Sequence, residues 1–592
     1  MNRVLLTAVL ACSALSSGEF MTATLEAKTA ASDAAAAFRS LAADYFEQAF
    51  FRFAPTSGTQ AGLHQYDTQL EDYTRAGVDR QIAALKNFEP KFDAVSDSGL
   101  DESTRGDLAM VRNNIRSALL ELETVRPWEK NPDNYSSGIA SSAFVLMERK
   151  FAPADDRLRS LIAREKQMPA VFTAAKENLK NPPHVYTEIA LEQLPYIVSF
   201  FEKDVPEAFT DAKDRATIAE FRKTNAAVIA ALNSYETWLK TDLLPRSNGD
   251  FRIGADTFSK KLLYDEMVDT ALDKLLTIAY ADLHKNQAEF ERIAKEVDPS
   301  KTPKEVLAEL GAIHPAPDQL LQTFRSTFDG LISFIHQKQI IAIPSDVQPT
   351  LEETPPFMRA TTQASMDSPG PFEKNSTTAY FNVTLPEKNW TAEHIAEHMA
   401  AFNQGTIIST SVHEAYPGHY VQFLWVKYSD LSQVRKIVTS NTNVEGWAHY
   451  CEQMMLDEGY GQPGTGAKDE REAKLIRLGQ LQDALLRDAR FIVGIKMHTG
   501  QMSFDQAVDF FVSDGYQSRS VATVETKRGT SDPTYLYYTL GKLQILKLRE
   551  DLRAKQGAAF SVQRFHDEFM RQGGAPIKIV RRALIGDDSP ML

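Results

Sequence analysis

The sequence of 592 residues has little cysteine, no dense run of basic residues and, beyond its N-terminus, no long apolar run. Its two cysteines are Cys12 and Cys451, so removal of an N-terminal leader would leave one cysteine and exclude an intramolecular disulfide. A membrane-spanning helix needs ~20 consecutive apolar residues, which excludes a span in the rest of the chain. Acidic residues outnumber basic ones by 79 to 65, so we expect no nucleic-acid partner.

The N-terminus reads MNRVLLTAVLACSALSSG: one arginine, a short apolar run and then small residues. This order is typical of a secretory signal peptide, which we predict over residues 1–22. The VLAC segment at 9–12 also resembles a lipoprotein box, in which Cys12 would carry a lipid anchor. The chain is therefore predicted to be exported, either to the periplasm or as an outer-membrane lipoprotein. Residues 23–36, which are small, polar and rich in alanine, are predicted to form a linker.

Apolar residues recur at spacings of three and four along most of the remaining chain, starting with AAFRSLAADYFEQAFFRF, and predict amphipathic helices. Strand-like segments are few: QIIAIP at 339–344 and TAYFNVTLP at 378–386. The sequence therefore predicts a mostly α fold with one small β-sheet, in a single unit over residues 37–592. We expect a helical N-terminal part over 37–370, and a second part over 371–592 that carries the chemistry.

The segment TSVHEAYPGHY at 410–420 contains an altered form of the zinc-protease motif H-E-x-x-H. His413 and Glu414 begin the motif, but Pro417 takes the place of the second histidine, and His419 follows two residues later. In a regular helix, residues six apart point about 120° away from each other, so the two imidazoles could not share an ion. Proline and glycine both disrupt helices. We predict that the Pro-Gly pair forms a two-residue bulge inside one helix and brings His419 into register.

A second helix is predicted over NTNVEGWAHYCEQMMLDEGY and supplies candidates for a third ligand. Glu445, His449 and Glu452 are spaced i, i+4, i+7 and share one face. Glu445 lies 26 residues beyond His419, close to the usual offset of the third ligand in Glu-type zinc peptidases, and His449 is its rival. Two imidazoles and one carboxylate leave one zinc position open, as in catalytic sites. Glu452 is a candidate to orient a ligand imidazole, or is an ordinary surface residue.

Another histidine pair, in TAEHIAEHMAAF, also has metal-capable spacing. His394 and His398 are four residues apart, with Glu393 and Glu397 beside them. No glutamate directly follows either histidine, and a polar helix face accounts for all four residues. We therefore favour the first motif as the metal site.

HEAYPGHYVQ followed by EGWAHYCE resembles the bacterial family known as domain of unknown function 885, whose members carry H-E-A-x-P-G-H-H and E-G-W-A. Segments near both ends of the chain also resemble this family, so the resemblance covers nearly the whole mature chain. Such proteins are described as mostly helical zinc peptidases, often exported and related in plan to angiotensin-converting enzyme and carboxypeptidase Taq. The resemblance implies a large helical fold with a deep cleft, one Zn²⁺ held by His413, His419 and Glu445, and Glu414 as the carboxylate that activates a zinc-bound water.

Stabilisation of the oxyanion formed in such a reaction needs hydrogen-bond donors besides the metal. Tyr538, in the segment YYTLG, and His498, in a segment that matches the family, are the candidates. Tyr535 and Tyr537 are rivals to Tyr538, because the sequence does not say which hydroxyl faces the metal.

Substrate-binding candidates lie in two other segments. Arg528 could bind a substrate carboxylate through two hydrogen bonds, or form a surface ion pair. TAYFNVTLP, with Tyr380 and Asn382, could be an edge strand that pairs with an extended peptide, or a purely structural strand. Gly529 and Gly494 stand where the family pattern leads us to expect tyrosine and aspartate, which puts substrate preference and activity in question.

The leading hypothesis is an exported zinc metallopeptidase that hydrolyses short peptides. The first alternative is a zinc-dependent hydrolase or tailoring enzyme that acts on a non-peptide amide. The second is a non-catalytic exported peptide-binding protein, in which zinc stabilises the fold or the site is degenerate. The sequence leaves all three open.

Overall fold

The computed structural model describes residues 33–359, 362–388 and 390–592. The predicted signal peptide and its Cys12 lie outside the described residues, as does most of the predicted linker, whose last positions, 33–36, are helical. Among the residues described, no helix combines the length and the apolar character needed to cross a membrane. The fold is mostly α-helical with one small three-stranded sheet, which confirms the predicted fold class.

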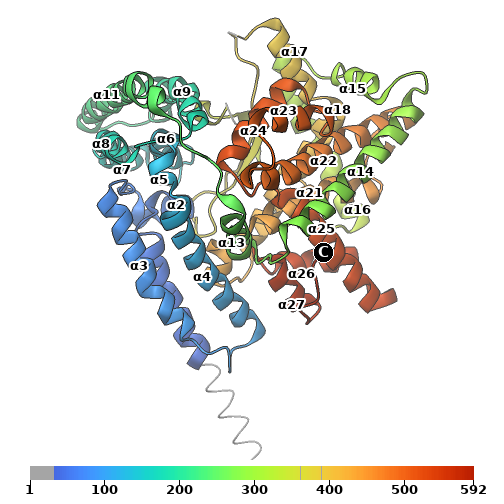
Figure 1. The fold of residues 1–592 in the computed structure, drawn as a ribbon, viewed down its shortest axis with the longest axis horizontal. Helices are drawn as coiled ribbons and strands as arrows, with labels where there is room; N and C mark the ends of the chain where they lie inside the picture. The colour runs from blue at the N-terminus through green and yellow to red at the C-terminus, as the bar shows by residue number, and fades with distance from the viewer. Residues whose placement is uncertain (1–32, 360–361, 389) are drawn as a thin grey trace, which may run out of the picture.

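A group of helices from the first half of the chain forms a core of its own and lies at the upper left in Figure 1. This group begins at α6, where Ile139, Ala140 and Ala143 are fully buried on the inward face. Its members are α6 (Asp133–Met147), α7 (Ala154–Glu165), α8 (Met168–Asn178), α9 (His184–Ser199), α10 (Val205–Ala208), α11 (Arg215–Trp238) and α12 (Leu244–Arg246).

A second core joins the start of the chain to its last third. Buried residues from 35 to 119 pack in one cluster with residues from 320 to 580, so the early helices support the later ones. The early helices are α2 (Pro55–Gln60), α3 (Arg75–Asp93), α4 (Glu102–Leu120) and α5 (Pro127–Lys130). They are followed, beyond the first group, by α13 (Gly254–Glu266), α14 (Leu272–Val297), α15 (Pro303–Gly311) and α16 (Leu320–Lys338).

The last third of the chain carries the helices that surround the HEAYPGH segment, at the right in Figure 1. α18 begins at an asparagine cap, since Asn403 Oδ1 accepts hydrogen bonds from the backbone N–H groups of Gly405 and Thr406. The helices are α17 (Ala392–Ala401), α18 (Gln404–Glu414), α19 (His419–Tyr428), α20 (Gln433–Ile437), α21 (Asn441–Asp457), α22 (Glu470–His498), α23 (Phe504–Ser513), α24 (Arg519–Ser531), α25 (Tyr537–Gln556), α26 (Val562–Met570) and α27 (Ile577–Leu584).

The three-stranded sheet has the order β1-β3-β2, with β1 at Thr350–Glu353, β2 at Ala364–Asp367 and β3 at Tyr380–Val383. β3 pairs in parallel with β1 and in antiparallel with β2. The predicted strand at 378–386 is thus present as the central strand, so the structural alternative is correct and the alternative of a peptide-binding edge is wrong. A separate parallel pair joins β4 (Gln462–Pro463) and β5 (Gly466–Ala467).

The other predicted strand, QIIAIP at 339–344, is not a strand in the structure. Its apolar residues Ile340 and Ile341 are buried, but its backbone bonds to helices and not to a sheet. The N–H of Ala342 donates to the carboxylate of Asp567 on α26, and the indole of Trp425 donates to the Ala342 carbonyl. A short buried apolar run therefore serves here as part of the connection between α16 and β1, packed against α19 and α26.

Candidate metal centre

The HEAYPGH segment breaks the helix completely. α18 ends at Glu414 and α19 begins at His419, so the predicted bulge inside one helix is instead a turn between two helices. The N–H of Gly418 donates to the carbonyl of Val412 at 2.9 Å. A Cβ at position 418 would lie 1.8 Å from the carbonyl oxygen of His413, so the turn has room only for glycine there. The rings of His413 and His419 lie 4.8 Å apart, nearly perpendicular, and thus share one space as the motif predicted.

Glu445 on α21 completes this cluster. Its Oε2 lies 3.5 Å from Nε2 of His413 and 3.3 Å from Nε2 of His419, and the three atoms lie within 4.8 Å of one another. Zn–N and Zn–O bonds of ~2.0–2.1 Å at tetrahedral angles separate neighbouring ligand atoms by about 3.3 Å. Glu445 Oε2 is buried and has no hydrogen-bond partner of good geometry in the described part of the chain. Both observations fit a site for one divalent metal ion.

The N-terminus of α21 is held by a carboxylate from a distant helix. Glu266, at the end of α13 and 2% exposed, accepts the N–H of Thr442 at 2.8 Å, its hydroxyl at 2.7 Å and the N–H of Asn441 at 3.2 Å. A negative charge at this end also interacts favourably with the helix dipole. Glu266 therefore anchors the helix turn from which Glu445 projects.

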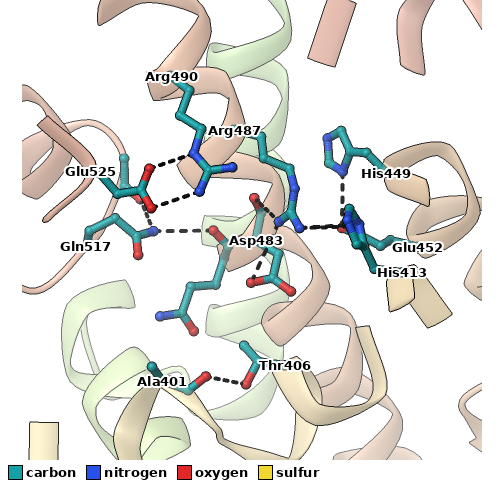
Figure 2. Close-up of polar contacts among 12 residues, drawn as sticks. Ala401, Thr406, His413, His449, Glu452, Asp483, Arg487, Arg490, Gln517 and Glu525 are labelled. Carbon is teal, nitrogen blue, oxygen red and sulfur yellow. Dashed lines mark hydrogen bonds and ion pairs between the residues drawn. The ribbon is translucent and has the colours of Figure 1, made fainter. Parts of the chain in front are cut away.

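A second layer of side chains orients His413, as Figure 2 shows. Glu452 is fully buried, and its Oε1 lies 2.6 Å from Nδ1 of His413. A proton on Nδ1 leaves Nε2 with a free lone pair toward Glu445 and His419. Arg487 on α22 pairs with Glu452 at 3.1 Å. Arg487 thus supports the carboxylate that orients His413, a role that no short motif in the sequence signals.

His449 belongs to this second layer. Its Nδ1 lies 3.1 Å from Glu452 Oε2, and the metal-capable cluster formed by the described residues does not include it. Burial lowers the pKa of His449 to about 3, so the imidazole is neutral. The structure therefore places Glu445, and not its rival, beside the two histidines.

The electrostatics of the cluster follow from burial and from close partners. Burial acts to lower the pKa of His413, but hydrogen bonds to Glu445 and Glu452 outweigh it and raise the value to about 9 in the metal-free chain. Burial acts to raise the pKa of Glu445, but the two imidazoles hold it well below its usual range. Burial raises the pKa of Glu414 and outweighs the opposing attraction of the two imidazoles, as expected of a carboxylate suited to accept a proton.

Tyr538 and Arg528 also lie at the cluster. α25 crosses α21 closely at Gly541 and Gly446, which brings the start of α25 beside the candidate metal centre. The ring of Tyr538 lies 6.2 Å from the ring of His413, and its hydroxyl accepts a hydrogen bond from Arg528 at 3.1 Å. Three guanidinium groups, from Arg487, Arg490 and Arg528, lie within 4.8–5.8 Å of the Tyr538 ring centre.

His498 is not brought to the cluster. It is fully buried between Phe251 and Phe258, with Nε2 2.7 Å from the carbonyl of Gly529, and lines none of the cavities described below. Tyr535 and Tyr537 do not line these cavities either. The hydroxyl of Tyr535 is buried, and the hydroxyl of Tyr537 donates a hydrogen bond to Asp532.

The two unexpected glycines both face the side chain of Tyr535, and Gly494 also faces the backbone carbonyl of Pro533. A Cβ on Gly529 would lie 2.4 Å from the hydroxyl of Tyr535, and a Cβ on Gly494 would lie 3.1 Å from its ring. The ring of Tyr535 therefore occupies the space that larger residues at both positions would need. Neither glycine lines the cavities at the candidate site.

Two adjoining cavities meet at the cluster. The first, of about 860 Å³, lies between α9, α24 and β2, and the second, of about 380 Å³, lies between α17, α22 and α24. His413, Glu414, Arg528 and Tyr538 line both of them. His394 and His398 line the second cavity, where His394 stacks on Trp390 and His398 bonds the Thr384 carbonyl, so they take no part in the metal cluster.

Tyr380 and Asn382 lie on the central strand, away from these cavities. The hydroxyl of Tyr380 donates to the Glu148 carbonyl at 3.2 Å, and Asn382 is 1% exposed. The strand that does face the first cavity is β2, through Ala364, Ser365 and Met366. Its sequence, ASMD, has none of the β-branched or aromatic residues typical of strands, which is why the sequence did not reveal it.

Comparison with known proteins supports the family resemblance. The chain matches, over residues 55–584, the family described as "Bacterial protein of unknown function (DUF885)". A lipoprotein candidate of unknown function from Shewanella oneidensis is 26% identical, with a TM-score of 0.74 over 93% of this chain and 99% of that chain. A lipoprotein candidate from Colwellia psychrerythraea, 18% identical, shares the fold with a TM-score of 0.77 over 93% of this chain and 98% of its own. No curated protein matches the chain. The chain therefore belongs to the DUF885 family of bacterial proteins of unknown function.

Proposed function

We propose that the protein is an exported, zinc-dependent metallopeptidase that hydrolyses short peptides. The observation that carries the proposal is the convergence of His413 Nε2, His419 Nε2 and Glu445 Oε2, with Glu414 lining the same cavity as these three residues. Two neutral nitrogens and one carboxylate suit zinc and leave a coordination position for a reactant.

Bound Zn²⁺ would supply Lewis acidity, which polarises a carbonyl and lowers the pKa of water. Glu414 then takes a proton from the attacking water and passes it to the departing amine. Tyr538, at the junction of the two cavities, offers its hydroxyl to the developing oxyanion. Arg528 donates a hydrogen bond to the Tyr538 oxygen, so the hydroxyl proton of Tyr538 points away from Arg528 and toward the reacting carbonyl.

A free edge of β2 at the first cavity supports a peptide as the substrate. Ser365 pairs with Asn382 of β3, and the N–H of Thr384 bonds the carbonyl of Gln363, so residues 363 and 365 direct their backbone groups toward β3. In an antiparallel ladder the alternate residues, Ala364 and Met366, then direct their N–H and C=O groups outward. These groups can pair with an extended peptide backbone, which favours a peptide over an isolated amide.

Export as a lipoprotein forms part of the proposal. The N-terminal VLAC segment supplies Cys12 for lipidation, and the two similar structures are both lipoprotein candidates. An anchor at Cys12 would leave the peptidase unit outside the cytoplasm.

The test is mass spectrometry of a mixed peptide library after incubation with the protein, with and without a chelator. We expect cleavage that zinc restores, and a loss of turnover of about 10²–10⁴-fold in Glu414→Gln with zinc still bound. Glu470→Gln, which removes an exposed carboxylate at the start of α22, is the matched control and should keep wild-type rates.

Zinc-loaded Glu414→Gln that cleaves as fast as wild type would falsify the mechanism. Peptide binding without any turnover in zinc-loaded wild type would instead identify a non-catalytic binding protein. Turnover of acyl amides alone would identify a hydrolase of another amide class.

A further inference from the structure

A third cavity, of about 400 Å³, adjoins the first one on the side of α19. Three apolar side chains, Met366, Phe423 and Val444, line both cavities. We call this third cavity the apolar recess; its wall is continued by Phe50, Val426 and Ile437. All six side chains are partly exposed, although apolar side chains are usually buried where they can be. Its volume lies in the range of ligand pockets, roughly 300–1,000 Å³.

The apolar recess begins directly at the metal ligands. Phe423 lies one helical turn after His419, and the two rings stack at 5.7 Å with an angle of 6° between them. Val444 immediately precedes Glu445 on α21. A side chain of a molecule bound at the cluster therefore needs to extend only past Phe423 and Val444 to enter the recess.

The free edge of β2 leads a peptide into the same place. Met366 contributes its side chain to the recess, and its outward backbone groups lie on the edge that we propose for substrate pairing. Successive side chains of a paired strand point to opposite faces, so the residue beside Met366 directs its side chain either to the recess or away from it. The opposite end of the site differs in character, because Arg359, Arg487 and Arg528 line the second cavity.

We propose that the apolar recess binds an apolar side chain of the substrate residue next to the scissile bond. The inference rests on the proposed peptidase function and names its substrate class: short peptides with leucine, phenylalanine or a similar residue at that position. Burial of such a side chain gives an expected preference of roughly 10- to 150-fold in kcat/KM over serine.

Val426→Asp tests the assignment, since Val426 lines the recess but not the other two cavities. We expect the variant to lose the preference for leucine and to gain affinity for peptides with arginine at the same position. A gain for arginine cannot result from a mere loss of stability. Val347→Asp, at a 44% exposed position before β1, is the matched control and should keep the leucine preference.

Two readouts separate this inference from the proposed function. Cleavage maps of a peptide series that varies one position at a time report the preference during turnover. Calorimetric titration of non-cleaved peptides into zinc-loaded Glu414→Gln reports it without turnover. Preferential binding of apolar peptides with no cleavage by wild type would refute the peptidase and keep the recess. Cleavage with equal rates for leucine and serine at both positions flanking the bond would overturn the recess.

Discussion

Replacement of Glu452 by glutamine should weaken zinc binding although Glu452 touches no metal. Its carboxylate contacts His413 at 2.6 Å, His449 at 3.1 Å and Arg487 at 3.1 Å, all in a fully buried position. Loss of such a partner from a ligand histidine typically lowers metal affinity by about 10- to 100-fold, or about 1.4–2.7 kcal/mol. The amide of glutamine keeps the shape of the side chain but not the charge, so the ligand loses its anionic acceptor and its fixed orientation.

The same change should also lower the free energy of unfolding. Removing one partner of a buried ion pair costs about 3–5 kcal/mol. The loss should fall near the lower limit of ~3 kcal/mol, because Arg487 also approaches Asp483 at 3.9 Å and keeps a second anion nearby.

Competition with a fluorescent zinc chelator at fixed pH measures the affinity, and urea unfolding of the metal-free protein measures the stability. Asp457→Asn is the matched control, because it removes a carboxylate from the exposed end of the same helix, where Asp457 pairs with Arg477 at 2.7 Å. Such a surface pair contributes about 0–1 kcal/mol and should leave zinc affinity unchanged. Wild-type affinity in a folded Glu452→Gln would refute the assigned role of this carboxylate.

Two further changes test the turn and a buried acid. Gly418→Ala should abolish zinc binding, because the added Cβ would lie 1.8 Å from the His413 carbonyl oxygen. Gly330→Ala is the control: it lies inside α16, and its Cβ would meet only the Tyr460 hydroxyl at 3.4 Å. Thermal melts should show that this control stabilises the protein by up to about 1 kcal/mol. Burial raises the pKa of Glu165 to about 8, so the folded state holds this proton more tightly than the unfolded state does. The resulting contribution to the free energy of unfolding is present below about pH 4.5 and is lost as pH rises through about 8. Glu165→Gln should remove up to about 4 kcal/mol of this pH dependence between pH 5 and 8.5. An unchanged pH dependence in urea unfolding of the variant would contradict the assignment.

The sequence predicted which residues of the candidate metal centre lie together, because local chemistry encodes their positions. His413, Glu414 and His419 lie within seven residues, and the Pro-Gly pair between the histidines signals a change of direction. The helical spacing of Glu445 and Glu452 placed both on the face that the structure turns toward the histidines. The form of the turn was predicted incorrectly, since helical geometry alone does not distinguish a bulge from two separate helices.

Residues that act across the fold were not predictable in the same way. Arg487, Glu266 and the edge strand β2 reach the site only through the packing of distant helices and strands, and nothing in their local sequence marks them. For the same reason the sequence did not decide between a peptide-binding edge and a structural strand for TAYFNVTLP. Strand order depends on pairing between segments, and a single strong β pattern is as typical of a central strand as of an edge.

The packing of Tyr535 against two glycines has a consequence for how such sequences diverge. Because its hydroxyl lies 2.4 Å from where a Cβ of residue 529 would be, a larger residue at 529 requires a smaller one at 535. Either change alone is harmful: the first creates a clash, and the second leaves a hole beside Gly494 and Met497. Positions 529 and 535 should therefore change together in related chains. A relative with tyrosine at 529 should carry a smaller residue at 535, so that the ring at 529 fills the same space.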